Sequence, residues 1–154
     1  MEDKKPLPSR IIAIDYGQVR IGLALSDATK VIAFPLTLAY AEKSTEATAK
    51  KLLKLLEEHA KTNQYSIAEI VVGLPLLMSG KSGLQADEVR YFVSVLQQWT
   101  SIPVKTWDER LTTVQAERSL REGALSRKQR AKVVDTASAV ILLQSYLDSR
   151  APVI

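Results

Sequence analysis

Three strand-like segments stand together in the first 40 residues, and the short links between them restrict the folds open to this chain. Residues 10–15 form an apolar run, residues 21–27 alternate large with small side chains, and a third candidate strand lies within residues 31–40, where Pro35 favours a strand start or a sheet edge. Short links join neighbouring strands in antiparallel pairs. The unbroken apolar run of the first strand predicts that it is buried on both faces of a sheet.

After residue 40, helical patterns alternate with single strands. Ser44 followed by Ala47 is not a capping box, so the start of the first helix is not fixed by the pattern. Right-handed crossovers predict that the later strands join the first in parallel, giving an α/β fold with a mixed five-stranded sheet flanked by helices, although periodicity leaves other α/β folds open. The predicted helices are 44–62, 84–99, 112–122 and 126–147, and the predicted strands are 67–72 and 104–108.

Size and composition favour one domain in a reducing compartment. The 154 residues include no cysteine, which excludes disulfides and a cysteine-ligated zinc site. No apolar run reaches the roughly 18 residues of a membrane span, and the polar start lacks the apolar core of a signal peptide. We interpret residues 1–9 as a disordered lead-in to a domain at 10–150, and we expect a cytoplasmic protein with no membrane partner.

Basic residues concentrate between Arg118 and Lys132. The formal net charge of +4 by itself barely favours a polyanionic partner. In this stretch, however, six basic residues are opposed only by Glu122. A solvated helix face and a contact with a phosphate backbone explain the stretch about equally well.

Carboxylates occupy three positions that topology can bring together. Asp15 ends the first strand before a glycine turn, Asp108 and Glu109 end the fifth, and Asp135 lies on a largely apolar stripe of the last helix. Because strand residues alternate between faces, only one of Asp108 and Glu109 can easily share a site with Asp15. Each position also has a purely structural explanation. Asp15 could belong only to a turn, Asp108 and Glu109 to a polar strand exit, and Asp135 could pair with an arginine or lie at an exposed helix margin.

Such a carboxylate group predicts a metal site. Ionised carboxylates repel each other, and oxygen ligands of this kind are those that Mg²⁺ prefers. A pair of metal ions would activate the attacking water and stabilise the leaving oxygen of a phosphodiester. The only histidine, His59, sits late in an amphipathic helix, is interpreted as structural, and excludes a multi-histidine site.

The loop after the fourth strand is rich in glycine but is not a P-loop. Pro75 stands where the first P-loop glycine should lie relative to residues 80–82. A phosphate-touching loop and a plain surface loop remain equally compatible with the pattern.

Four sequence blocks resemble the YqgF/RuvX family, and together they span residues 10–148. They read DYGQVRIGLALSD, GLPLLMSG, DERLTT and KVVDTASAVILLQSYLD. The resemblance implies a ribonuclease H-like fold, similarity to Holliday-junction resolvases of the RuvC type, and a part in maturing the 5′ end of pre-16S ribosomal RNA. RuvC-type enzymes carry a glutamate on the fourth strand, where this chain has Gly73 and Leu74, so the geometry of the metal site can differ.

The resemblance also assigns roles to residues. Asp15, Glu109 and Asp135 match the acidic positions expected to hold Mg²⁺ or Mn²⁺, with Asp108 the alternative to Glu109. The candidates for phosphate contacts, by motif position and charge, are Arg20, Lys81 and Arg110.

We therefore expect a metal-dependent endonuclease that acts on structured RNA, with pre-16S rRNA as the substrate. The alternatives are a Holliday-junction resolvase acting on branched DNA as a symmetric dimer, and a non-catalytic nucleic-acid binder. An actin-like ATPase also starts with an Asp-x-Gly strand, but this chain is too short for its two lobes. The sequence does not decide between a monomer and a homodimer.

Overall fold

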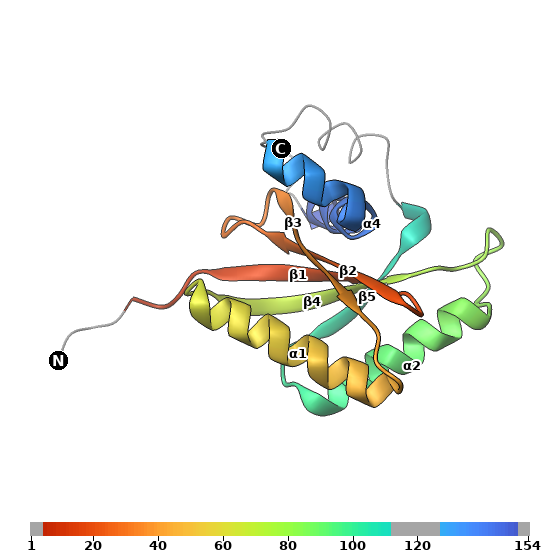
Figure 1. Ribbon diagram of the computed structural model, residues 1–154. Coiled ribbons are helices and arrows are strands. Elements are labelled where there is room, and N and C mark those ends of the chain that lie inside the picture. Colours follow the sequence, from red (N-terminus) through yellow and green to blue (C-terminus); the bar gives the residue numbers. More distant parts are fainter. Residues whose placement is uncertain (1–4, 112–126, 151–154) are drawn as a thin grey trace.

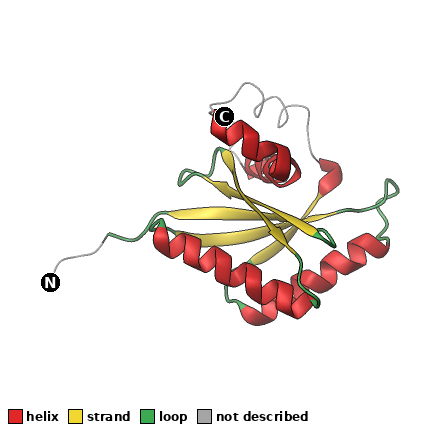
Figure 2. Cartoon of the chain, viewed as in Figure 1, coloured by secondary structure: helices red, strands yellow, loops and turns green. Residues whose placement is uncertain are grey.

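The computed structural model describes residues 5–111 and 127–150, with the side chains of 127–135 outside the described set. The helix expected at 112–122 therefore lies outside the described residues, as do all the side chains of the basic stretch from Arg118 to Lys132. Within them, one sheet is covered by α1 and α2 on one face and by α4 on the other (Figures 1 and 2). The elements are β1 (Ser9–Asp15), β2 (Arg20–Ser26), β3 (Ala33–Tyr40), α1 (Thr45–Thr62), β4 (Ser66–Leu74), α2 (Leu84–Trp99), β5 (Val104–Asp108), the 3₁₀ turn η1 (Glu109–Leu111) and α4 (Arg127–Arg150).

The predicted mixed sheet is confirmed. Its strand order is β3-β2-β1-β4-β5, with β1 antiparallel to β2 and parallel to β4. β1 is the central strand of the sheet and is covered on both faces, which explains its apolar run: Ile11 to Ile14 are fully buried. Pro35 lies in the edge strand β3, beside a register shift, where its missing N–H costs no ladder bond inside the sheet.

Each face of the sheet has its own apolar core. Ile12 and Ile14 of β1 pack toward α1 and α2, whereas Ile11 and Ala13 pack toward α4. This alternation follows from the pleat of the strand. It also predicts which residues at the end of a strand will face α4.

Two details at the ends of elements were left open by the sequence patterns. Glu109 does not extend β5 but opens η1, so its position is not fixed by strand alternation. The start of α1 is set by Ser44, whose hydroxyl oxygen accepts a hydrogen bond from the Ala47 N–H at 3.1 Å. A side-chain cap therefore forms here without the reciprocal glutamate of a capping box.

Buried polar contacts fix α4 on the sheet. The Gln144 side chain accepts from the Ala33 N–H and donates to the Val31 carbonyl, each at 2.9 Å. The Tyr146 hydroxyl donates to the buried carboxylate of Glu69 on β4. In the part of the chain that the structure describes, no helix is long and apolar enough to cross a lipid bilayer.

Candidate active site

The parallel strands β1, β4 and β5 end at one edge of the sheet. Asp15 is the last residue of β1, and Leu74 at the end of β4 pairs with Asp108 at the end of β5. Ligands of open α/β sheets collect at the carboxyl ends of strands. This edge is therefore the place to look for convergent polar groups.

Asp15 and Glu109 meet on the α4 face of this edge. Asp15 follows Ile11 and Ala13 in the alternation of β1, which directs it toward α4. A methyl group at Gly73 of β4 would lie 2.5 Å from Glu109 Oε1 and 3.1 Å from Leu142 of α4. The side chain of Glu109 therefore lies directly over the Gly73 backbone, beneath α4.

The carboxyl groups of Asp15 and Glu109 are hydrogen-bonded and shift each other's pKa. Burial raises the pKa of Glu109 to about 7, and the charge of Asp15 and a hydrogen bond to it act in the same direction. Burial also raises the pKa of Asp15, while the hydrogen bond with Glu109 opposes the change. In its protonated form Glu109 thus donates to the Asp15 carboxylate, as expected when two acids share a desolvated site.

Asp108 faces a different partner. The Arg110 guanidinium donates to both oxygens of Asp108, with the shortest contact at 2.7 Å from Nη2. This pairing lowers the pKa of Asp108 below its ordinary value. Of the two acids between which the sequence left a choice, the structure brings Glu109 to Asp15.

Asp135 lies on α4 next to Thr136, where the helix departs from helical backbone angles (φ −122°, ψ 15°). A methyl group at Gly22 would lie 3.8 Å from both the Asp15 Cβ and the Thr136 Cα. The backbone of α4 at this point thus passes beside Asp15. The side chain of Asp135 is outside the described set, so its role as a third ligand stays a prediction.

Gly22 and Gly73 were not singled out by the sequence analysis as site residues. Each lies inside a strand and each lets a carboxylate or α4 approach the sheet closely. An isolated glycine within a strand pattern is a signal for such close approach. In GLALSD the glycine fits an alternation of large and small side chains, and in VVGLP the pattern predicts that Gly73 begins a loop, whereas the structure places Gly73 in β4.

The carboxylate pair fits a hard divalent cation. Oxygen donors, partial burial and mutual repulsion are the conditions under which such a cation relieves a carboxylate cluster. Among side chains that the structure describes, no three acidic or histidine groups gather to hold a metal. Asp15 and Glu109 could therefore supply two oxygen ligands to such a cation, and Asp135 is the expected third.

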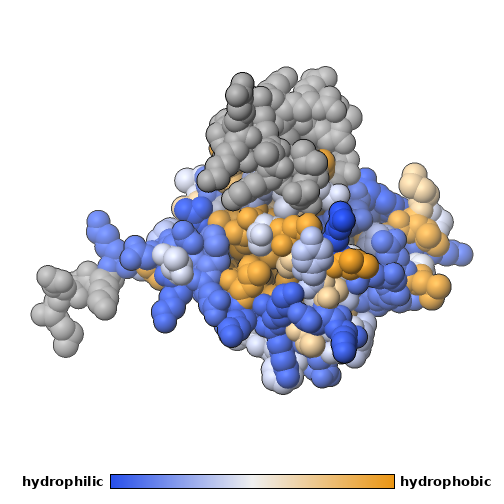
Figure 3. All heavy atoms as spheres, in the orientation of Figure 1, coloured by the Kyte–Doolittle hydropathy of each residue, from blue (hydrophilic) through white to orange (hydrophobic). Residues whose placement is uncertain are grey.

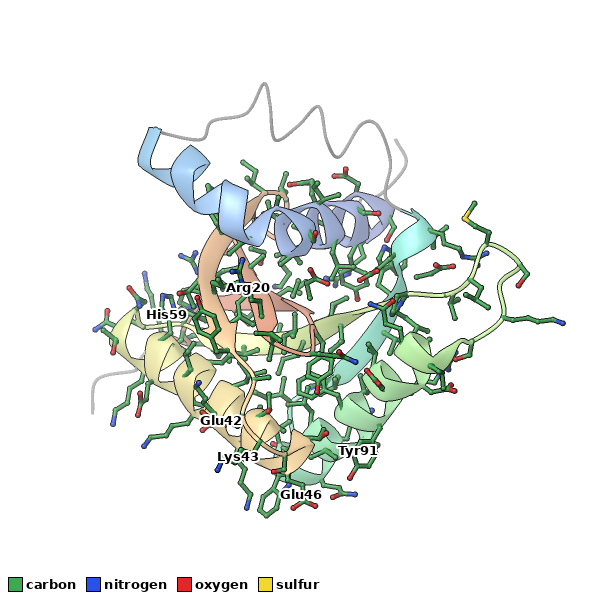
Figure 4. The ribbon with its side chains drawn as sticks, turned by 45° about the vertical axis from the view of Figure 1, so that its right-hand side comes forward. Arg20, Glu42, Lys43, Glu46, His59 and Tyr91 are labelled. Carbon is green, nitrogen blue, oxygen red and sulfur yellow. The ribbon has the colours of Figure 1, made fainter. Side chains whose placement is uncertain are left out.

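Two of the predicted basic residues are exposed near this edge. Arg20 precedes Gly22, the partner of Asp15, by two positions, which places both on the α4 face. Figure 4 agrees, since the labelled Arg20 lies on the side of the strands toward α4. Lys81 is exposed in the loop that joins β4 to α2.

Arg110, the third residue expected to contact phosphate, is held by groups of the protein, and its phosphate contact stays a prediction. Besides Asp108, its Nη1 donates to the Met78 carbonyl at 3.4 Å, and its guanidinium lies against Gly80. Gly80 has a positive φ of 85°, a conformation that glycine adopts without strain. Arg110 thus ties the loop carrying Lys81 to the end of β5.

A groove on the α1 side of the sheet is separate from the carboxylate pair. It has a volume of about 670 Å³ between α1 and β3, with Leu36 and Leu55 among its lining residues, and apolar side chains gather over this face in Figure 3. His59 lines it and shares a 2.7 Å hydrogen bond with Tyr65, which supports the structural interpretation of this histidine. None of its lining residues belongs to the carboxylate site.

The mixed sheet has the strand order of the ribonuclease H-like class of α/β proteins, with Asp15 at the end of β1 and Glu109 directly after β5. Over residues 9–149 the chain matches the family model described as "RuvX: Holliday junction resolvase". The chain belongs to the RuvX family.

A relative supports this assignment, and two solved structures share the fold. A protein of Protochlamydia amoebophila named "Putative pre-16S rRNA nuclease" is 59% identical over 148 residues, covering 96% of this chain and 99% of the relative. The fold is shared with Thermus thermophilus RuvC in complex with a Holliday junction substrate, with a TM-score of 0.51 at 12% identity over 92% of this chain and 96% of RuvC. It is also shared with the Fowlpox virus resolvase in complex with Holliday junction DNA, with a TM-score of 0.54 at 15% identity over 93% and 99% of the two chains.

Proposed function

We propose that this protein is a metal-dependent nuclease that hydrolyses phosphodiester bonds in structured RNA, with the 5′ end of pre-16S rRNA as its substrate. The observation that carries the proposal is the half-buried Asp15–Glu109 pair at the carboxyl edge of the sheet. The name of the Protochlamydia relative supports the choice of substrate. A substrate of this kind places the protein in the cytoplasm.

Asp15, Glu109 and Asp135 would hold Mg²⁺ or Mn²⁺. When bound, the metal supplies an activated water and stabilises charge on the leaving oxygen. In the reaction the water oxygen bonds to phosphorus as one ester P–O bond breaks, which leaves a phosphate monoester and a hydroxyl group. Arg20 and Lys81 would orient the phosphate backbone by charge, which positions the strand without reading its sequence.

The geometry gives Gly73 and Arg110 positioning roles. Gly73 leaves the space that Glu109 occupies, and Arg110 fixes the loop from which Lys81 projects. Neither residue needs to touch substrate for its loss to weaken cleavage.

The test is cleavage of two labelled substrates, a pre-16S 5′-leader RNA and a four-way DNA junction, with Mg²⁺, Mn²⁺ or EDTA. We expect metal-dependent cutting of the RNA. Asp15→Asn, Glu109→Gln and Asp135→Asn should each reduce the rate by about two orders of magnitude, the scale of removing one charge-stabilising group from an active site. Glu46→Gln, an exposed carboxylate at the start of α1 (Figure 4), is the control and should leave the rate unchanged.

A Holliday-junction resolvase is the second candidate. The family description and the two junction-bound structural neighbours favour it. It requires a symmetric dimer, because two matched cuts need two sites. Cutting of the junction but not the RNA would establish it, and binding without cutting in any metal would instead leave a non-catalytic binder.

A further inference from the structure

A second hollow borders the turn that directly follows Asp15 and is lined from the α2 side of the sheet. It has a volume of about 600 Å³ and is formed by the turn between β1 and β2 together with the first turns of α2. The two elements lie next to each other in Figure 1. Tyr16, in its wall, directly follows Asp15, so the chain itself joins this hollow to the carboxylate site.

The apolar part of the hollow is preformed. The ring of Tyr16 stacks on Phe92, with centroids 4.1 Å apart and planes at 16°, and Phe92 is fully buried in the core. Val19 and Leu84 at the rim are 66% and 85% exposed. The Tyr16 ring, fixed by Phe92, and the exposed side chains of Val19 and Leu84 form a surface against which a flat, partly apolar ligand can pack.

The polar side chains of the hollow, Gln18 and Glu88, are only weakly hydrogen-bonded to each other. Gln18 Nε2 donates to the two carboxylate oxygens of Glu88 at 3.2 and 3.4 Å, and both side chains are exposed. Long hydrogen bonds between exposed groups contribute little to stability. Glu88 can therefore accept hydrogen bonds from a ligand, and the released Gln18 amide offers both a donor and an acceptor.

We propose that this hollow holds one unpaired nucleobase next to the phosphodiester bond that is cleaved. The inference rests on the proposed nuclease function, because a strand whose phosphate lies at Asp15 and Glu109 would bring a neighbouring base to Tyr16. Unpaired bases in RNA are recognised by packing on aromatic rings and by hydrogen bonds to their Watson–Crick edges.

The carboxylate selects among the bases. Guanine presents N1–H and N2–H side by side, and these two donors match the two oxygens of Glu88. Uracil presents a single N3–H between two carbonyl oxygens, which a carboxylate would repel. The hollow should therefore prefer guanine.

The first test is binding without metal, followed by fluorescence anisotropy in EDTA. The probes are three labelled RNA pentanucleotides that carry guanine, uracil or an abasic sugar between identical uridines. The intact protein should bind the guanine probe more tightly than the other two, by about fivefold or more. Glu88→Gln should lose the advantage of guanine over uracil, and Val19→Trp, which fills the hollow from an exposed position, should lose the advantage over the abasic probe.

Two variants serve as controls. Glu57→Gln removes an exposed carboxylate from α1, and Tyr91→Trp enlarges an exposed aromatic residue of α2 that does not line the hollow (Figure 4). Both should keep the binding order of the intact protein. Equal binding of the three probes, no measurable binding of any of them, or the same order in Glu88→Gln and Val19→Trp as in the controls would overturn the inference.

The second test separates this inference from the nuclease proposal. Cleavage ends of an RNA with randomised unpaired positions are sequenced for the intact protein and for Glu88→Gln. We expect guanine at a fixed position relative to the cut, and a loss of that preference in the variant. Guanine-selective binding without metal-dependent cutting would contradict the nuclease proposal alone, whereas cutting with an identical base preference in both proteins would contradict this inference alone.

Discussion

Gly73 shows how a single hydrogen atom in place of a side chain can shape the candidate site. In Gly73→Ala the new methyl group would overlap Glu109 Oε1, and Glu109 can swing away because it is flexible. We expect a stability loss below about 1 kcal/mol but a fall in cleavage rate of roughly 100-fold, since small misplacements of a reacting group are costly. Urea unfolding and cleavage assays measure the two effects.

Gly83→Ala is the matched control, because a methyl group there would meet only Leu77, at 3.4 Å or more. It should leave the cleavage rate within about twofold of the parent, since its contacts are of ordinary van der Waals length. A Gly73→Ala protein as active as this control would show that the placement of Glu109 over Gly73 is not needed.

Glu69 is a charged residue whose role is structural. Burial raises its pKa, but the hydrogen bond from Tyr146 and the charges of Lys105 and Arg150 lower it by more, so the net shift is downward. A lowered folded-state pKa means that the carboxylate stabilises the fold above its unfolded-state value near 4.5, and that this contribution is lost as pH falls through the folded-state pKa.

We therefore expect Glu69→Gln to lower the free energy of unfolding by about 1 kcal/mol at pH 7, because the acceptor of the Tyr146 hydrogen bond loses its charge, and with it the ion pairs to Lys105 and Arg150. The difference from the parent should shrink below pH 4.5. Urea unfolding across this pH range measures it, with the exposed Glu57→Gln as control. A difference that does not depend on pH would contradict the role of the Glu69 charge.

At the scale of elements, α4 contributes both to the core and to the site. It covers the sheet face on which Asp15 and Glu109 lie, and its residue 135 is the third proposed ligand. The side chain of Gln144 connects this helix to the edge strand by bonding to the backbone of residues 31 and 33.

Replacing Gln144 with leucine should destabilise the protein by about 2 kcal/mol or more, because two backbone groups at the edge of β3 lose their partners. Chemical denaturation measures the change. Gln98→Leu, on the exposed face of α2, is the control and should stay within about 0.5 kcal/mol of the parent. Equal effects of the two substitutions would show that the Gln144 contacts do not hold α4 to the sheet.

At the scale of the whole molecule, a formal net charge of +4 favours a polyanionic partner only if some cations lie where the strand passes. Arg20 and Lys81 are the exposed candidates near the carboxylates. Substituting both with glutamine should weaken RNA binding and lower the slope of log K against log salt by about 1.5, as expected for two lost phosphate contacts. Titration of binding at several salt concentrations measures the slope.

Lys43→Gln with Lys61→Gln removes the same charge elsewhere and is the control for this experiment. Both lysines are exposed, Lys43 just before α1 and Lys61 in its last turn, and thus belong to the α1 side of the sheet, whereas Arg20 lies on the α4 face (Figure 4 labels Lys43). If both double variants change the slope equally, binding responds to net charge rather than to these two positions.

The sequence alone determined the order of the elements, the mixed sheet and the acidic positions of the candidate site. These follow from local patterns, because strand and helix periodicity and turn residues act over a few neighbouring positions. The family resemblance supplied the ribonuclease H-like fold and the nuclease hypothesis. The apolar run at residues 10–15 is one such local pattern: it indicates a central strand, because only a central strand buries both of its faces.

Tertiary structure decided what depends on residues distant in sequence. The choice of Glu109 over Asp108 required the position of Gly73 beneath one acid and of Arg110 beside the other. The hollow at Tyr16 exists only because α2 packs against the turn that follows β1. Periodicity assigns a residue to a face, but the close approach of two backbones and the pairing of charges arise only when the layers pack together.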